Sequence, residues 1–405
     1  MPSRSQLVSA AFFALVFQIS FSLAVVHADA QQVCNPSVTK PITVASPVQR
    51  LAAGQKAQPP ITDVNSPFAW PDTPTSVIKS GTAYTFFASD GGKRSRQLWQ
   101  GHYVGNNKYG SVVTTVGTLD NPLGTGDPQD VSISPNPDPS VNPNYSSYTY
   151  MGGGPVYQVP AGMTGAGNLL VVYHAEIIND ALYAVLGLAA SSDGGLHWTD
   201  LGEIIRLNQA YAAGLDAFEI GDGPLVLSPD GKYFYLYFPD WMNNGTLHRT
   251  TTTNVSVARA RTSSVLNAAF GNSGKTPQRT VAFEKFYQKS WNLQPGIGGA
   301  STDLIPSSFD QGYLDIHYSS ALQRYVMIIS NDTTFGYAES TDGLAWTTPV
   351  SLGDFDTIAA YPTAVGLGAD PHDLGKQFYI FYTHLPTDGT GWTNGRLERI
   401  MLTCQ

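Results

Sequence analysis

Short apolar and aromatic stretches recur along most of the chain, separated by turns rich in Gly, Pro, Asp and Asn. Five of them resemble one another in being continuously apolar, aromatic or β-branched: AYTFFAS, LLVVYHA, YFYLYFP, RYVMIIS and FYIFYTH. Runs of this length, bounded by turn residues, are typical of strands buried between packed sheets. The pattern therefore predicts an all-β chain.

Each of these stretches is the second of about four strand candidates in a unit, and five such units follow one another. Repeated four-stranded units predict a five-bladed β-propeller. In the first unit the strands are expected at residues 75–79, 83–88, 97–104 and 111–119, and a helical turn is expected at residues 263–270 of the third. A β-sandwich or jelly roll would also bury strands, but it would not produce five similar units.

The two ends of the chain are expected to close the ring together. The fifth unit has only three strand candidates, and the segment at residues 42–48 can supply the fourth. Cys34 and Cys404 are the only cysteines and lie near the two ends. In an oxidising compartment such a pair forms a disulfide, which requires the ends to meet in space. A closed ring of blades meets this requirement.

The first 30 residues have the features of a signal peptide. Arg4 precedes an apolar stretch that runs from Leu7 to Val26, and Ala28 and Ala30 frame a small-residue cleavage site. An uncleaved anchor is the alternative. We expect a secreted protein, extracellular or periplasmic, in which residues 31–405 form one propeller domain. We also expect a monomer without a membrane-spanning segment after cleavage.

Charge narrows the range of partners. The net charge is −9, and the sequence contains no run of Lys or Arg. Nucleic acids need clustered positive charge, so they are not expected as partners. An anionic polysaccharide would also need a basic patch, and the sequence indicates none.

Two turns carry a more specific motif. Residues 191–198 read SSDGGLHW, and residues 340–346 read STDGLAW. Both resemble the Asp-box of sialidase-like propellers, in which Asp organises its own turn and Trp packs between strands. Their place between third and fourth strands implies a structural role, on the face opposite an active site.

Candidate chemistry gathers where first strands begin and second strands end, because these positions surround the mouth of a propeller's central channel. Carboxylates, histidines and aromatic residues at these positions are typical of carbohydrate sites. The candidates for substrate binding here are Asp130, His174, Glu176, Asp240, Trp241, His317, Tyr361 and His384.

The five units with acidic residues at the inner strands resemble the five-bladed glycoside hydrolases, which include arabinanases, β-xylosidases and the invertase and levansucrase group. The resemblance implies that Asp72 is the catalytic base. It implies a general acid in the Asp222-Gly223-Pro224 turn, where that family has Glu, with Glu219 three residues earlier. It also implies that His317 contacts an ion through water, for which a structural calcium in the channel is the candidate.

The chain departs from that family at the start of the second unit, where Gly153-Gly154-Pro155 replaces an acidic residue. Asp130 or Glu176 could substitute for it in space. Asp130 lies in the loop before this strand in the predicted arrangement.

These observations predict a secreted glycoside hydrolase with paired carboxylates. The resemblance favours a pentose polymer of the arabinan or xylan type and inversion at the anomeric carbon. A polysaccharide lyase using His174, Tyr361 or His384 is one alternative. A sialidase is another, although it needs three arginines and the predicted channel residues include none. A catalytically inactive carbohydrate-binding propeller is the third.

Overall fold

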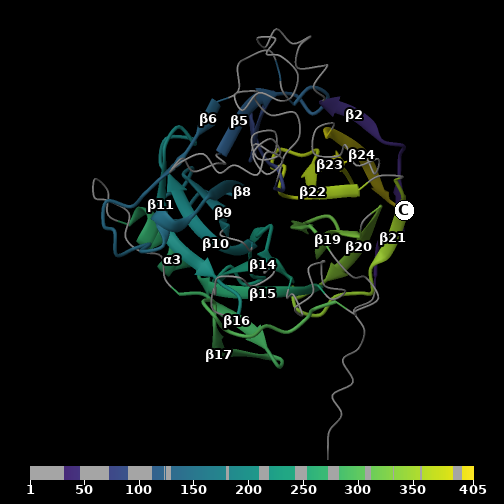
Figure 1. The fold of residues 1–405 in the computed structure, drawn as a ribbon. Coiled ribbons are helices and arrows are strands. Elements are labelled where there is room, and N and C mark those ends of the chain that lie inside the picture. Colours follow the sequence, from purple (N-terminus) through teal and green to yellow (C-terminus); the bar gives the residue numbers. More distant parts are fainter. Residues whose placement is uncertain are drawn as a thin grey trace, which may run out of the picture.

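The fold is a ring of five sheets (Figure 1). The computed structural model describes residues 32–45, 73–89, 112–122, 124, 129–178, 182–208, 219–241, 253–271, 282–305, 312–331, 333–355, 358–385 and 395–405. The predicted five-bladed β-propeller is therefore confirmed. The predicted signal peptide, residues 1–30, lies outside the described residues. In the described part of the chain, no helix is long and apolar enough to cross a membrane.

Blades 1 and 4 have four strands each in simple antiparallel order. Blade 1 consists of β3 (Ser76–Ser80), β4 (Ala83–Ala88), β5 (Val112–Gly117) and β6 (Gln129–Val131). Blade 4 consists of β18 (Leu314–Ser319), β19 (Arg324–Asn331), β20 (Thr334–Ser340) and β21 (Val350–Asp354). The prediction that residues 111–119 form the fourth strand of blade 1 is wrong. This segment contains the third strand, β5, and the three-residue β6 is the fourth. The strand expected at residues 97–104 lies outside the described residues.

Blade 2 has a fifth strand on its outer edge. It consists of β8 (Tyr150–Gln158), β9 (Leu169–Ile178), β10 (Leu182–Ser191), β11 (Trp198–Ile205) and β7 (Ile133–Ser134). The short β7 pairs in parallel with β11, and the 3-10 turn η1 (Tyr145–Ser147) lies between β7 and β8. The connection from blade 1 thus covers an edge that would otherwise expose unpaired backbone groups.

Blade 3 is extended by an additional hairpin. Its innermost segments β12 (Glu219–Ile220) and β13 (Leu225–Leu227) both pair with β14 (Tyr233–Trp241). The outer strands are β15 (Thr253–Arg261), β16 (Glu284–Tyr287) and β17 (Ser290–Pro295), and the helix α3 (Thr262–Phe270) confirms the predicted helical turn. Gln288 and Lys289, which join β16 to β17, have φ values of 49° and 62°. Two successive positive φ values are typical of a tight two-residue hairpin.

Blade 5 joins the two ends of the chain. It consists of β22 (Ile358–Gly366), β23 (Gln377–Leu385) and β24 (Arg396–Cys404), to which β1 (Pro36–Val38) and β2 (Ile42–Ala45) add from the N-terminal side. Cys34 and Cys404 form a disulfide with 4.9 Å between their Cα atoms and a separation of 370 positions in sequence. The predicted closure by an N-terminal strand and the predicted disulfide are both confirmed.

A buried carboxylate of blade 4 holds the closing segment in place. Glu339, which is fully buried, accepts the backbone N–H of Val33 on Oε2 (2.7 Å) and that of Cys34 on Oε1 (2.9 Å). Its Oε1 also accepts the hydroxyl of Tyr337 (2.8 Å). The ring closure therefore has a polar anchor beside the disulfide.

Glu339→Gln is expected to lower the free energy of unfolding by about 1–3 kcal/mol, because the new amide nitrogen would face a backbone N–H donor and leave it unsatisfied. The measurement is urea unfolding of the oxidised protein. Tyr337→Phe is the matched control, since it removes one donor and leaves both acceptors, and its loss should be smaller. Equal losses for the two variants would contradict the anchoring role.

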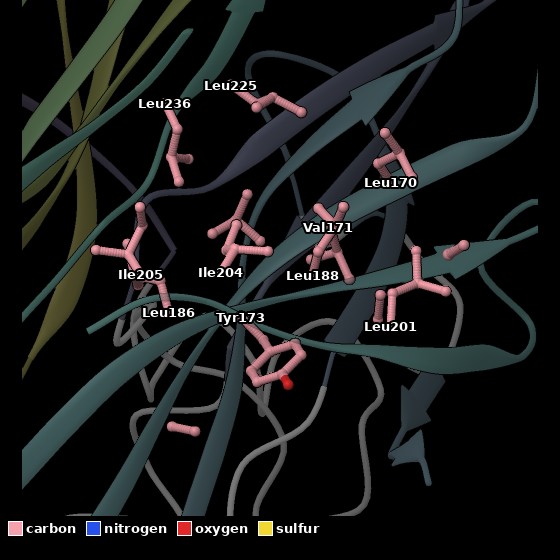
Figure 2. Close-up of a cluster of buried hydrophobic side chains, with 14 of the residues drawn as sticks. Leu170, Val171, Tyr173, Leu186, Leu188, Leu201, Ile204, Ile205, Leu225 and Leu236 are labelled. Atoms are coloured by element: carbon pink, nitrogen blue, oxygen red, sulfur yellow. The ribbon is translucent and has the colours of Figure 1, made fainter. Parts of the chain in front are cut away.

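The largest apolar core lies between blades 2 and 3 (Figure 2). Leucine and valine side chains of β9, β10 and β11 pack there against Leu225 of β13 and Leu236 of β14. Tyr173 crosses this sheet, and its hydroxyl donates to Oδ1 of the buried Asp200 in β11 (2.7 Å). Gly187 of β10 makes the crossing possible, because a Cβ there would lie 1.9 Å from the tyrosine ring.

Three consecutive glycines in β8 explain why blade 2 has no inner acidic residue. A Cβ on Gly153 would lie 2.4 Å from a methyl group of Val112 in blade 1. One on Gly154 would lie 2.7 Å from the backbone oxygen of Val172 and 3.3 Å from that of Asp222 in blade 3. Side chains at these positions would therefore clash with blades 1 and 3 and with β9 of the same blade.

Both Asp-box turns lie between the third and fourth strands of their blades, as predicted. In the first, Ser191 donates to Oδ1 of Asp193 (2.8 Å), and the same oxygen accepts the backbone N–H of His197 (3.0 Å). In the second, Asp342 Oδ1 accepts the N–H groups of Leu344 and Ala345, both at 2.8 Å. Each carboxylate is used within its own turn, which fits the structural role implied by the resemblance.

Candidate functional site

The channel mouth is the face where inner strands begin and second strands end. The ends of β9, β14 and β23 lie at this face, together with the starts of β18 and β22. Of the predicted site residues, the structure describes the side chains of His174, Glu176, Asp222, Asp240, His317, Tyr361 and His384. It describes only the backbone of Asp130, Glu219 and Trp241, and Asp72 lies outside the described residues.

Buried hydrogen bonds from side chain to backbone join successive blades around the ring. They link Val156 N–H to Ser76 Oγ (2.6 Å), His174 Nδ1 to Ile220 O (2.9 Å), Leu314 N–H to Asp222 Oδ2 (2.6 Å), Ala364 N–H to Asp315 Oδ2 (2.7 Å) and Thr75 N–H to Thr363 Oγ1 (2.8 Å). All five joints between blades carry one. Two predicted site residues, His174 and Asp222, thus also bind the adjacent blade.

Asp222 combines burial with an unusual backbone conformation. It is 2% exposed and lies between β12 and β13 with a φ of 57°, a conformation that is uncommon outside glycine. The next residue, Gly223, has a φ of 100°, and a Cβ there would lie 2.6 Å from Val172. The turn presses a carboxylate against blade 4 while the chain approaches blade 2 closely.

Tyr361 has a similarly strained backbone in the first strand of blade 5. Its φ is 53°, at a β-bulge that shifts the pairing of β22 with β23 between Ala360 and Thr363. Its buried ring lies 4.1 Å from that of Tyr313, measured between centroids. Strained residues collect at functional sites when the surrounding structure holds them in place. Asp222 and Tyr361 show this feature on inner strands.

His174 and Glu176 lie on the same face of β9, as their spacing predicts. Nε2 of His174 is 3.0 Å from Oε1 of Glu176, and both side chains are buried. Since Nδ1 faces the carbonyl oxygen of Ile220, both ring nitrogens face oxygen acceptors. A proton must therefore lie between the imidazole and the carboxyl group. The pair keeps a buried proton near the channel mouth.

Asp130 lies in β6, the outermost strand of blade 1, where it pairs with Val113 of β5. The expectation that it lies in a loop is therefore wrong. The short QDV segment lacks the apolar alternation that marks a longer strand. Glu219 of β12 pairs with Trp241 of β14 at the channel-mouth end of blade 3, so these two predicted residues lie opposite each other in the sheet.

Asp240 is enclosed at the same end of blade 3. It is 4% exposed, and its Oδ2 accepts the hydroxyl of Ser301 (2.9 Å). Burial raises the pKa of Asp240, although the charge of Lys285 and the bond from Ser301 act against this rise. The contact of Asp240 with substrate stays a prediction.

Lys285 is a buried cation that the sequence interpretation missed. Its Nζ donates to the backbone oxygens of Arg206 (2.8 Å) and Gly299 (2.7 Å). Burial lowers the pKa of Lys285 to about 8, and the nearby Asp240 charge partly offsets this effect. Lys285 shares the parity of the buried Phe283 along the strand, and this alternation is the signal that could have placed it inside.

His384, at the end of β23, pairs with a carboxylate that the sequence interpretation did not single out. Its Nδ1 lies 3.3 Å from Oε2 of the buried Glu398, which also accepts the hydroxyl of Tyr382 (2.6 Å). Burial acts to raise the pKa of Glu398, but bonds from His384, Tyr382 and Arg396 outweigh it and lower this pKa to about 2. Arg396, which was not among the predicted channel residues, lies beside His384, with 3.4 Å between its Nη2 and Nδ1 of the histidine.

His317 lies nearer the opposite face, in the second half of β18. Its Nε2 is 2.8 Å from Oδ2 of Asp315, and its ring is 5.5 Å from that of His372 in the β22–β23 connection. Burial acts to lower the pKa of His317, but the charges of Asp315 and Asp370 and the bond to Asp315 outweigh it and raise this pKa.

Among the described residues, no three His, Cys, Asp or Glu side chains form a group that could hold a metal. A calcium ion reached through water from His317 stays a prediction.

Stability should respond to pH through His317. The pKa of His317 is raised in the folded state, so its protonation adds to the free energy of unfolding. This contribution is fully present below a pH of about 6.5 and is lost as the pH rises through the pKa that His317 has in the folded protein. The measurement is the unfolding free energy of wild type and His317→Gln between pH 6 and 9. The difference between the two should shrink toward high pH. Comparing the proteins cancels the opposite trend from Lys285, whose depressed pKa makes stability rise with pH above about 8. A pH-independent difference would contradict the assignment.

Comparisons with known proteins show similarity in the backbone fold only. No protein-family model matches the sequence, and no curated protein matches it significantly. A family 117 glycoside hydrolase from Zobellia galactanivorans has a TM-score of 0.49 at 12% identity, over 92% of this chain and 90% of that one. The α-L-arabinofuranosidase PaAbf62A from Podospora anserina has a TM-score of 0.46 at 10% identity, over 84% and 95%. The Bacillus subtilis arabinanase Arb43A has a TM-score of 0.41 at 13% identity, over 84% and 94%.

Proposed function

We propose that this protein is a glycoside hydrolase that uses paired carboxylates at the channel mouth. The observation that carries the proposal is Asp222, a buried carboxylate at positive φ in an innermost segment of the ring. Backbone strain of this kind costs stability and persists where function uses the geometry. A carboxyl group fixed in position and shielded from water suits a general acid.

In the proposed reaction the Asp222 turn supplies the acid, from Asp222 or from Glu219, and protonates the leaving glycosidic oxygen. Asp72 is the proposed base that activates water on the other face of the sugar. Support for Asp72 comes from Thr73, which is buried at the joint of blades 1 and 2 and donates to Gly153 O (2.8 Å). Inversion is the proposed outcome, for which the two carboxyl groups would be about 6.5–9.5 Å apart.

The proposed substrate is a pentose polymer of the arabinan or xylan type. His174 with Glu176, Tyr361, and His384 with Arg396 provide hydrogen-bonding and aromatic groups for sugar recognition near the mouth. The disulfide is consistent with a protein that acts in an oxidising compartment outside the cytoplasm.

The test is release of reducing sugar from a panel of plant and microbial polysaccharides, with wild type, Asp72→Asn and Asp222→Asn compared. The proposal expects at least one polymer to be cleaved by wild type and by neither variant. Product with ultraviolet absorbance from a new double bond would indicate a lyase instead.

A carbohydrate-binding propeller without catalysis is the second candidate. The observation that favours it is that Asp222 makes the same kind of bond to the next blade as Asp315 does. Both carboxylates would then serve only to join blades. Binding of a polymer without release of reducing sugar, by protein of confirmed fold, would establish this alternative.

A further inference from the structure

Blade 3 carries a cleft of about 560 Å³ beside its additional hairpin. Residues of β15, β16 and β17 line it together with Tyr233. Tyr233 begins β14 and Arg261 ends β15, so the cleft lies at the end of the blade opposite the channel mouth. Two of its lining strands, β16 and β17, form the outer edge of blade 3 (Figure 1). This volume is in the range of cavities that bind small ligands.

The arginine side chain at the centre of the cleft is held in a fixed position. The guanidinium carbon of Arg259 lies 4.3 Å from the ring centroids of both Tyr233 and Trp291. Its Nε donates to Oε1 of Glu284 (2.6 Å), and the Trp291 ring stacks in turn on Tyr235 at 5.7 Å. A guanidinium held in this way loses little freedom when it binds a ligand.

Several arginine donors in the cleft have no acceptor in the part of the chain that the structure describes. Among the described residues, neither Nη atom of Arg259 has a hydrogen-bond acceptor. The exposed Arg261, 5.4 Å from the ring of Tyr233, likewise has no acceptor within the described ranges. Gln294 accepts the backbone N–H of Ala300 through Oε1 (3.0 Å), which leaves its NH₂ group as a further donor.

The cleft is locally basic on an acidic protein. Its lining contains two guanidinium groups and one carboxylate, whereas the whole chain has a net charge of −9. The sequence indicated no basic patch because it contains no run of Lys or Arg, and Arg259 and Arg261 do not form one. Their parity places both on one face of β15, where Arg259 is packed against Tyr233 and Trp291 and Arg261 is exposed.

We infer that this cleft is a second saccharide site, separate from the channel, that binds the carboxylate of a uronic-acid unit. A planar carboxylate matches the paired N–H groups of a guanidinium edge, and Tyr233 offers aromatic surface to the sugar ring. The choice of a saccharide rests on the proposed function, because a hydrolase of plant polymers would be held on its substrate by such a site.

The test is calorimetric titration of the full chain with trigalacturonate, with its methyl ester as a neutral ligand that has the same sugar rings and linkages. Trigalacturonate should bind and the ester should bind at least about tenfold more weakly, since the ester removes the charge-assisted bonds. Arg261→Gln should weaken binding about tenfold. Arg259→Lys should weaken binding as well, because lysine keeps the positive charge but lacks the paired N–H groups of the guanidinium. Arg324→Gln, outside the cleft, is the matched control and should leave the Kd unchanged.

Three results would overturn the inference: equal binding of the ester, no effect of Arg261→Gln, or displacement of trigalacturonate by inorganic sulfate at similar concentration. The last would identify a general anion site. Asp222→Asn separates this site from the proposed function, since it should bind trigalacturonate as wild type does. If binding follows the arginines while no polymer is cleaved, the hydrolase proposal fails and the cleft still stands as a uronate site.

Discussion

Asp222→Asn is expected to reduce the rate of polysaccharide hydrolysis by about 10²–10⁴-fold, the usual contribution of a general acid. Its free energy of unfolding should stay close to that of wild type. Asparagine is nearly isosteric with aspartate, and its Oδ1 can still accept the N–H of Leu314. The substitution therefore removes the acid and keeps the joint between blades 3 and 4. Hydrolysis rates and urea unfolding of the same preparations provide the measurement.

Two further variants separate catalysis from architecture at this position. Asp222→Ala should lose hydrolysis and also about 1–3 kcal/mol of stability, because the buried N–H of Leu314 is left without an acceptor. Ser76→Ala removes the corresponding bond to Val156 at another joint and should lower stability while hydrolysis continues. If Asp222→Asn hydrolyses as fast as wild type, Asp222 is a joint between blades and not the acid.

Loss of the disulfide should produce the largest change in stability. The chain-entropy treatment of a 370-residue loop gives about 6 kcal/mol, and a measured loss of about 2–5 kcal/mol is expected for Cys34→Ser with Cys404→Ser. The smaller value follows because the reduced, unfolded chain retains some structure. The native ring stays closed without the disulfide, because β1 and β2 still pair with β24 and Glu339 still binds the N-terminal segment. Urea unfolding of the double variant against the oxidised wild type measures this loss.

Glu339 offers a test of that explanation. The disulfide and Glu339 hold the same segment, so their effects should not be additive. Glu339→Gln should therefore cost a different amount in the serine background than in the oxidised protein. Strict additivity would show that the two contacts act independently and that the closing segment is held elsewhere.

The sequence predicted the ring and its closure because these depend on long apolar strands and on two cysteines. The second strands that begin at Leu169 and Tyr233 are buried on both faces along most of their length, so their apolar patterns are continuous and easy to read. The strand that begins at Ala83 is buried in its second half. The short strands β6, β7 and β17 were missed. They hold only a few residues each, and pairing with a neighbour rather than intrinsic preference defines them.

The candidate site was predictable in part. Alternation along β9 correctly placed His174 beside Glu176, since their contact is local. The partners of Asp222 and His384 could not be predicted, because Leu314 and Glu398 reach them only through the arrangement of blades. The three glycines of β8 illustrate the same limit. They mark a missing carboxylate in the sequence, and only the packing of Val112, Val172 and Asp222 against Gly153 and Gly154 shows why side chains are excluded there.

The composite blade 5 has a consequence for biosynthesis. Its edge strand, β1, leaves the ribosome first and its partner β24 leaves last. At about 5–20 residues per second, the intervening chain takes on the order of 20–70 s to synthesise. During that time the N-terminal strand has no partner, Cys34 remains a thiol, and four blades can assemble without a closed ring. Newly made chains should therefore depend on chaperones that shield an open edge, and oxidation of this cysteine pair should mark the completion of folding.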